Sequence, residues 1–100
     1  MLKRNQILLS DWLTDYYKHL ADVYDLSFSE MIRIGLCLSV VAGVNKFYPE
    51  YKSNLTIEEI IELIKKTDKD TCGEEERHKL ISQIYFEARK AAEFRMNKEK

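Results

Sequence analysis

Apolar residues recur at helical spacing along the first half of the chain. Residues 11–24 predict an amphipathic helix, because large apolar side chains follow one another at intervals of four, three and four positions. A second helix is expected from Ser27 to about Val41, since Ser27 and Glu30 have the spacing of a capping box and an apolar run follows them. The stripe of the first helix consists of Leu13, Tyr17, Leu20 and Tyr24.

The second half predicts two more helices. Thr56 and Glu59 repeat the capping-box spacing and open a helix with isoleucines on one side. A longer helix is expected over residues 74–96, whose acidic start and basic end suit the helix dipole. The stretch around Pro49 predicts an ordered connector. The expected organisation is an N-terminal domain at 1–44, a connector at 45–55 and a C-terminal helical extension at 56–100.

Lys3–Leu9 has extended character and predicts a single short strand. No second strand is predicted, so the backbone N–H and C=O groups of this strand need a partner, and the simplest one is the same strand of another copy. The sequence therefore predicts a two-fold symmetric homodimer joined by an intermolecular two-stranded antiparallel β-ribbon. Ile7 and Leu9 would face its core, and Arg4, Gln6 and Leu8 would face outward.

Two stretches of the N-terminal half carry a family resemblance. They are I-x-L-S-D-x-L at positions 7–13 and L-A-x-x-x-D-L-S-x-S-E-x-I-R at positions 20–33. With the order strand, helix, helix, residues 2–43 resemble the ribbon-helix-helix family of DNA-binding proteins. The resemblance implies a mainly α fold, namely a ribbon-helix-helix homodimer with a C-terminal two-helix extension. Asp25 stands where the family usually has glycine, which implies a left-handed backbone conformation there.

The resemblance also implies that the chain binds double-stranded DNA. The ribbon would read base edges in the major groove, and the start of the second helix would hold a backbone phosphate. The implied base contacts are Arg4, Gln6 and Leu8, and the implied phosphate contacts are Lys3, Ser27, Phe28 and Ser29, with Lys18 as a further cation within possible reach. The implied dimer core contains Ile7, Leu9, Leu13, Ile32, Gly35 and Leu36.

The second predicted helix is apolar on more than one side. Ile34, Cys37 and Leu38 occupy positions that would face solvent in a minimal two-helix protein, so we expect the C-terminal helices to cover them; the alternative is a surface for a protein partner or ligand. Gly35 is expected to allow two of these helices to approach across the dimer axis. Trp12 and Tyr16 are expected to pack against the connector or the last helix, with stacking on a ligand as the alternative.

The near-zero net charge of the chain argues against non-specific DNA binding. The 100 residues contain 16 Lys and Arg against 17 Asp and Glu, so the net charge is -1 and the whole molecule should not adhere to polyanions. DNA affinity would depend on a small patch, doubled by dimer symmetry, and its salt dependence would be shallow.

Other chemistry is not expected. The sequence has no catalytic motif and no cofactor motif, and His19 and His78 are isolated, so we predict neither an enzyme nor a metal site. Residues 68–79 begin like a calcium loop but end on lysine instead of glutamate. Cys37 and Cys72 lack zinc spacing and are expected to be thiols.

These patterns predict a cytoplasmic protein without a membrane span, since the longest uncharged apolar run, 34–44, is about half of the roughly 20 residues that a span needs. The predicted function is sequence-specific DNA binding as a dimeric transcriptional repressor or regulator. The alternative is a protein-interaction module, such as an antitoxin or a partition or conjugation accessory factor. A higher oligomer or a protein partner could bind through the C-terminal helices.

Overall fold

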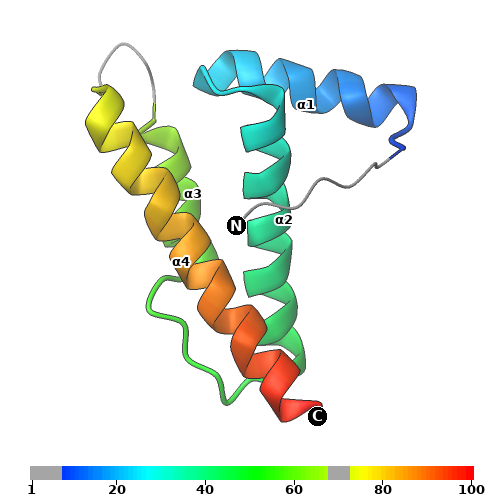
Figure 1. Cartoon of the computed structure of the whole chain (residues 1–100), viewed down its shortest axis with the longest axis vertical. Coiled ribbons are helices and arrows are strands. Elements are labelled where there is room, and N and C mark those ends of the chain that lie inside the picture. The colour runs from blue at the N-terminus through cyan, green and yellow to red at the C-terminus, as the bar shows by residue number, and fades with distance from the viewer. Residues whose placement is uncertain (1–7, 68–72) are drawn as a thin grey trace.

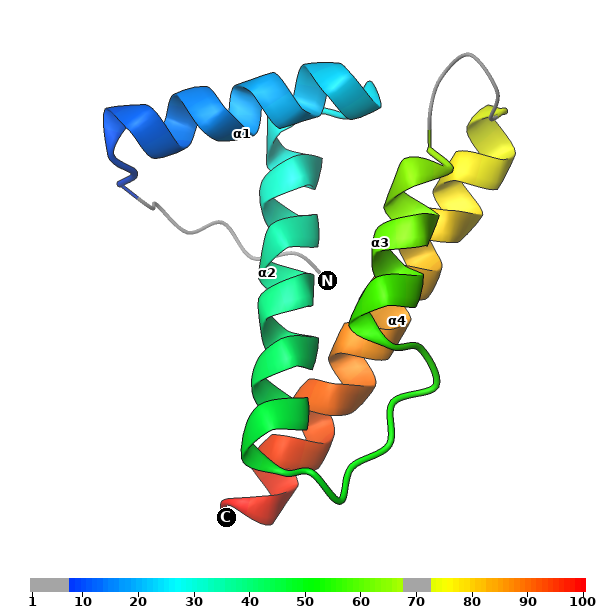
Figure 2. The same ribbon diagram turned by 180° about the vertical axis from the view of Figure 1, so that it is seen from behind.

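The computed structural model describes residues 8–67 and 73–100, which form four helices (Figure 1). Helix α1 lies across one end of α2, whereas α3 and α4 form an antiparallel pair along one side of α2 (Figure 2). Helices α2 and α4 are closest near the C-terminal end of the chain and diverge toward α1. The helix bounds are α1 Asp11–Tyr24, α2 Phe28–Phe47, α3 Ile57–Lys65 and α4 Glu74–Lys98.

The predicted β-ribbon is wrong for the described part of the chain, which is all-helical and contains no strand. The ribbon-helix-helix homodimer is therefore not the fold described here, although a mainly α fold is confirmed. Residues 8–10 are irregular, and the side chain of Leu8 is 99 % exposed. A strand requires a neighbouring backbone, and the described residues offer none to this segment. The predicted strand residues 3–7 lie outside the described residues.

Local capping signals account for the starts of α2 and α3. Helix α1 has the predicted bounds, and both capping boxes form: Ser27 with Glu30 at α2 and Thr56 with Glu59 at α3. Helix α2 continues six residues beyond the predicted end at Val41, because the apolar run persists and only the approach to Pro49 stops it.

The core lies between α2, α3 and α4, with a contribution from the end of α1. The prediction that the C-terminal helices cover α2 is confirmed for the side that carries Ile34, which is fully buried. The buried apolar residues are Ala21, Met31, Ile34, Val41, Val44, Ile60, Ile64, Ile81, Ile84, Ala88 and Ala91.

Helix α2 is only partly buried on its other sides by the described residues. Among the described residues it is the helix long and apolar enough to cross a bilayer, a property that the core helices of globular proteins share. Only 22 % of its most apolar window is buried within the chain. An apolar helix is stable in water when its surface is covered, and residues 8–67 and 73–100 leave part of the α2 surface exposed, including Leu36 and Phe47.

Candidate functional site

The turn between α1 and α2 sets the position of the start of α2. Asp25 has φ 54° and ψ 46°, so the left-handed conformation predicted for it is confirmed. The amide of Leu26 donates to the Ala21 carbonyl at 2.9 Å, and the amide of Asp25 donates to the Asp22 carbonyl at 3.3 Å. These two bonds close the end of α1 and turn the chain directly into the capping box of α2.

The start of α2 is exposed and has unused donors. The Ser27 hydroxyl accepts from the Glu30 amide at 3.1 Å, and the Glu30 carboxylate accepts from the Ser27 amide at 3.2 Å. Within residues 8–67 and 73–100, the amides of Phe28 and Ser29 have no protein acceptor. Together with the positive end of the helix dipole, two such amides suit a phosphate oxygen.

Lys18 of α1 adds a positive charge at this end. Its ammonium lies 5.9 Å from the centre of the Phe28 ring, so it stands beside the first turn of α2. This placement brings Lys18 together with Ser27, Phe28 and Ser29, three of the predicted phosphate contacts. The fourth predicted contact, Lys3, lies outside the described residues.

The predicted base contacts are placed only in part. Leu8 is fully exposed ahead of α1, and Arg4 and Gln6 lie outside the described residues. Of the predicted base contacts, the structure therefore describes Leu8, which lies just before α1.

The predicted dimer-core residues are incompletely covered in the single chain. Leu9, Leu13, Ile32 and Gly35 are half-buried, and Leu36 is 55 % exposed. No described helix covers the first half of α1, which projects away from α3 and α4 (Figures 1 and 2). We call the surface formed by Trp12, Leu13, Tyr16, Ile32 and Leu36 the apolar face. Ile7, another predicted core residue, lies outside the described residues.

Trp12 and Tyr16 do not pack as predicted. They are 71 % and 53 % exposed, because the half of α1 that carries them lies far from both the connector and α4. The ring of Tyr16 contacts the neighbouring Tyr17 edge-on, with 5.8 Å between ring centres. Trp12 and Tyr16 are therefore the large exposed aromatic residues of the apolar face.

Gly35 is explained by a contact within the chain. A Cβ atom built there would lie 3.0 Å from Cε1 and 3.1 Å from Cζ of Tyr17, and closest of all to the Tyr17 hydroxyl. The predicted approach of two α2 helices across a dimer axis is thus not needed to account for this glycine. The close crossing is that of α1 over α2.

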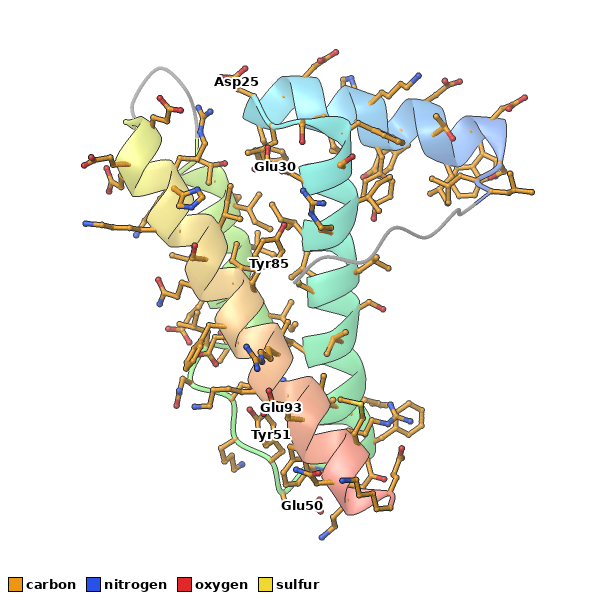
Figure 3. All side chains as sticks on the ribbon, viewed as in Figure 1. Asp25, Glu30, Glu50, Tyr51, Tyr85 and Glu93 are labelled. Atoms are coloured by element: carbon orange, nitrogen blue, oxygen red, sulfur yellow. The ribbon has the colours of Figure 1, made fainter. Side chains whose placement is uncertain are left out.

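Two arginines join this region to α4, and sequence patterns did not single out either contact. Arg77 hydrogen-bonds to Asp25, and Nε of Arg33 donates to the Tyr85 hydroxyl at 3.2 Å. Figure 3 shows Asp25 near the start of α4, and Tyr85 on the side of α4 that faces α2. Long-range pairs of this kind carry no local spacing signal, which is why helical periodicity could not identify them.

No group of three His, Cys, Asp or Glu side chains in the described ranges is placed to hold a metal ion. Burial raises the pKa of the Cys37 thiol to about 11, so this cysteine is a weak nucleophile at neutral pH.

Glu87 is a further residue that the sequence did not reveal. It sits among the buried apolar positions of α4, accepts a long 3.4 Å hydrogen bond from Asn54, and its Oε2 has no partner in the described part of the chain. This contact attaches the connector to α4.

The chain matches no protein-family model, no curated protein and no solved structure, so any function has to be argued from the residues themselves.

Proposed function

We propose that this chain is a sequence-specific DNA-binding protein that acts as a homodimer, most simply as a transcriptional repressor or regulator. One observation carries the proposal: the α1–α2 turn presents the exposed start of α2, where two amides have no acceptor among the described residues and Lys18 lies beside them. This is the part of the family resemblance that the described residues can support. A phosphate bound there would orient the duplex without reading its sequence.

Self-association is supported by the apolar face. Trp12, Tyr16 and Leu36 are more than half exposed, and α2 is only partly buried by the described residues, so a second copy could cover the exposed parts of both helices. A symmetric pair would double the phosphate-binding start of α2. The DNA site would then consist of a repeated half-site.

Sequence specificity is assigned to the N-terminal segment. Arg4 can bond guanine O6 and N7, and Gln6 can bond adenine N6 and N7, whereas Leu8 offers only an apolar contact. Leu8 is 99 % exposed, so its side chain is available for such a contact.

The packing of the C-terminal half does not favour the alternative of an antitoxin-like module. Such a segment would become ordered on its protein partner, but α3 and α4 already pack against α2 in the single chain. We therefore propose DNA binding and not partner capture.

Selection of bound sequences from a random DNA pool tests this function directly. We expect enrichment of a repeated short half-site and loss of binding to it in the double variant Arg4→Ala, Gln6→Ala. The matched control is Gln83→Ala, Arg89→Ala, which removes the same two residue types from the exposed surface of α4. A pool without enrichment, or a double variant that retards the selected DNA like the control, would contradict the proposal.

A further inference from the structure

The first turn of α4 holds the α1–α2 turn through one side chain. Nη1 of Arg77 donates to the backbone carbonyl of Asp25 at 3.1 Å, and Nη2 donates to its carboxylate at 3.3 Å. The two donors of one planar guanidinium thus bind the backbone and the side chain of the same residue. This arrangement restricts both the position and the orientation of Asp25.

Asp25 has a backbone conformation that this pair of hydrogen bonds can stabilise. It is the only non-glycine residue with positive φ among the described residues. The left-handed conformation is costly for a residue with a Cβ atom, although aspartate tolerates it better than most. A guanidinium on both acceptors of Asp25 favours this conformation over its alternatives, so Arg77 compensates for the absence of glycine.

The arginine in this contact is shielded from solvent, whereas Asp25 is exposed. The Arg77 side chain is only 19 % exposed, and its Nε is buried. The Asp25 carboxylate is more open to solvent, so we attribute the effect to the geometry of the paired hydrogen bonds and not to charge alone. Arg33 and Tyr85 link α2 to α4 below this point, which helps to keep the two helices in register.

We infer that Arg77 is a positioning residue: it holds Asp25 in the left-handed conformation and thereby orients the start of α2. The C-terminal half of the chain then contributes to the site, because α4 supports the turn that presents Ser27, Phe28 and Ser29. The connection to DNA rests on the proposed function, whereas the support of the turn does not.

Hydrogen exchange of the whole protein tests the support of the turn. In Arg77→Met we expect the amides of Asp25 and Leu26 to exchange about tenfold faster, since two hydrogen bonds to a charged group are lost. Amides in the middle of α2 should keep their protection. Arg89→Met is the matched control, because it removes the same charge from an exposed position on the same helix.

Two further variants separate positioning from general destabilisation. Arg77→Lys should restore part of the protection, since an ammonium can bind one acceptor but not both in the fork geometry of arginine. Asp25→Gly in the Arg77→Met background should also slow exchange at Leu26, because glycine adopts the left-handed conformation without strain. Equal exchange in Arg77→Met and Arg89→Met, or faster exchange along all of α2, would overturn the inference.

DNA affinity provides the second readout. We expect Arg77→Met to bind a selected DNA about three- to tenfold more weakly than Arg89→Met does, with the same salt dependence, because both variants lose one charge. Equal affinities would overturn the link between Arg77 and the phosphate-binding end. If neither protein binds DNA, the proposed function fails, while the exchange rates still decide whether Arg77 supports the turn.

Discussion

At the scale of single residues, close packing and left-handed backbone explain positions that polarity alone does not. Gly35 lies under the Tyr17 ring, and Asp25 takes a conformation that favours glycine. The second could be predicted from the sequence, because the resemblance marked its turn position. The first could not, because the crossing of α1 over α2 depends on distances between side chains.

The two glycines of α2 should respond to alanine in opposite ways. Gly35→Ala is expected to lower the free energy of unfolding by about 1–3 kcal/mol, since its Cβ meets the Tyr17 ring. Gly43→Ala should raise it by about 0.5–1 kcal/mol, because its Cβ has no neighbour closer than 3.9 Å and alanine favours the helix. Urea unfolding measures both values. Stabilisation by both substitutions would disprove the tight contact at Gly35.

The thiol of Cys37 should react slowly. Burial raises its pKa from 9.0 to about 11, so the thiolate fraction near pH 8 falls by about 100-fold relative to the unfolded chain. The free energy of unfolding should also fall as the pH rises above 9, since the unfolded chain releases this proton first. Labelling with a disulfide reagent in a Cys72→Ser background, with and without denaturant, measures the difference. Equal labelling rates would contradict burial.

At the scale of elements, the starts of helices were more predictable than their ends or their contacts. Capping boxes at Ser27 and Thr56 mark the starts of α2 and α3, whereas α2 ends six residues beyond its predicted end. The exposure of Trp12 was also missed, because periodicity states which side of a helix is apolar but not what lies against it. The predicted ribbon failed for a related reason, since a strand is defined by its partner.

The capping box of α2 gives a prediction at this scale. Ser27→Ala should lower the free energy of unfolding by about 1 kcal/mol, because its hydroxyl accepts from the Glu30 amide. Ser29→Ala, two positions later, is the control and should change it by less than about 0.5 kcal/mol, since Ser29 is exposed. Thermal or urea unfolding distinguishes the two, and equal effects would argue against the cap.

At the scale of the whole molecule, the described residues cover one side of α2 and leave apolar side chains exposed on another. Helices α3 and α4 pack against α2 on the covered side, and the apolar face lies on α1 and α2. The sequence predicted both the covering by the C-terminal helices and the surplus of apolar residues on α2. The placement of Leu13, Ile32 and Leu36 in a dimer core stays a prediction; in the structure Leu13 and Ile32 are half-buried and Leu36 is 55 % exposed.

Self-association through the apolar face is testable by charge insertion. Leu36→Glu should shift the protein from dimer to monomer in sedimentation equilibrium, because a carboxylate at the interface would be buried without a partner. Phe86→Glu on α4 is the matched control, since Phe86 is 57 % exposed against 55 % for Leu36 but lies outside the face. If both variants remain dimeric, or if only Phe86→Glu dissociates, the proposed face is wrong.

The two-sided use of α2 has a thermodynamic consequence. Helix α2 packs against the internal core on one side and would contact a second copy on the other. Contacts that order the helix on one side therefore reduce the conformational entropy that remains to be lost when contacts form on the other side. Folding and assembly would then be linked equilibria, and dilution alone would loosen the packing of the C-terminal helices against α2.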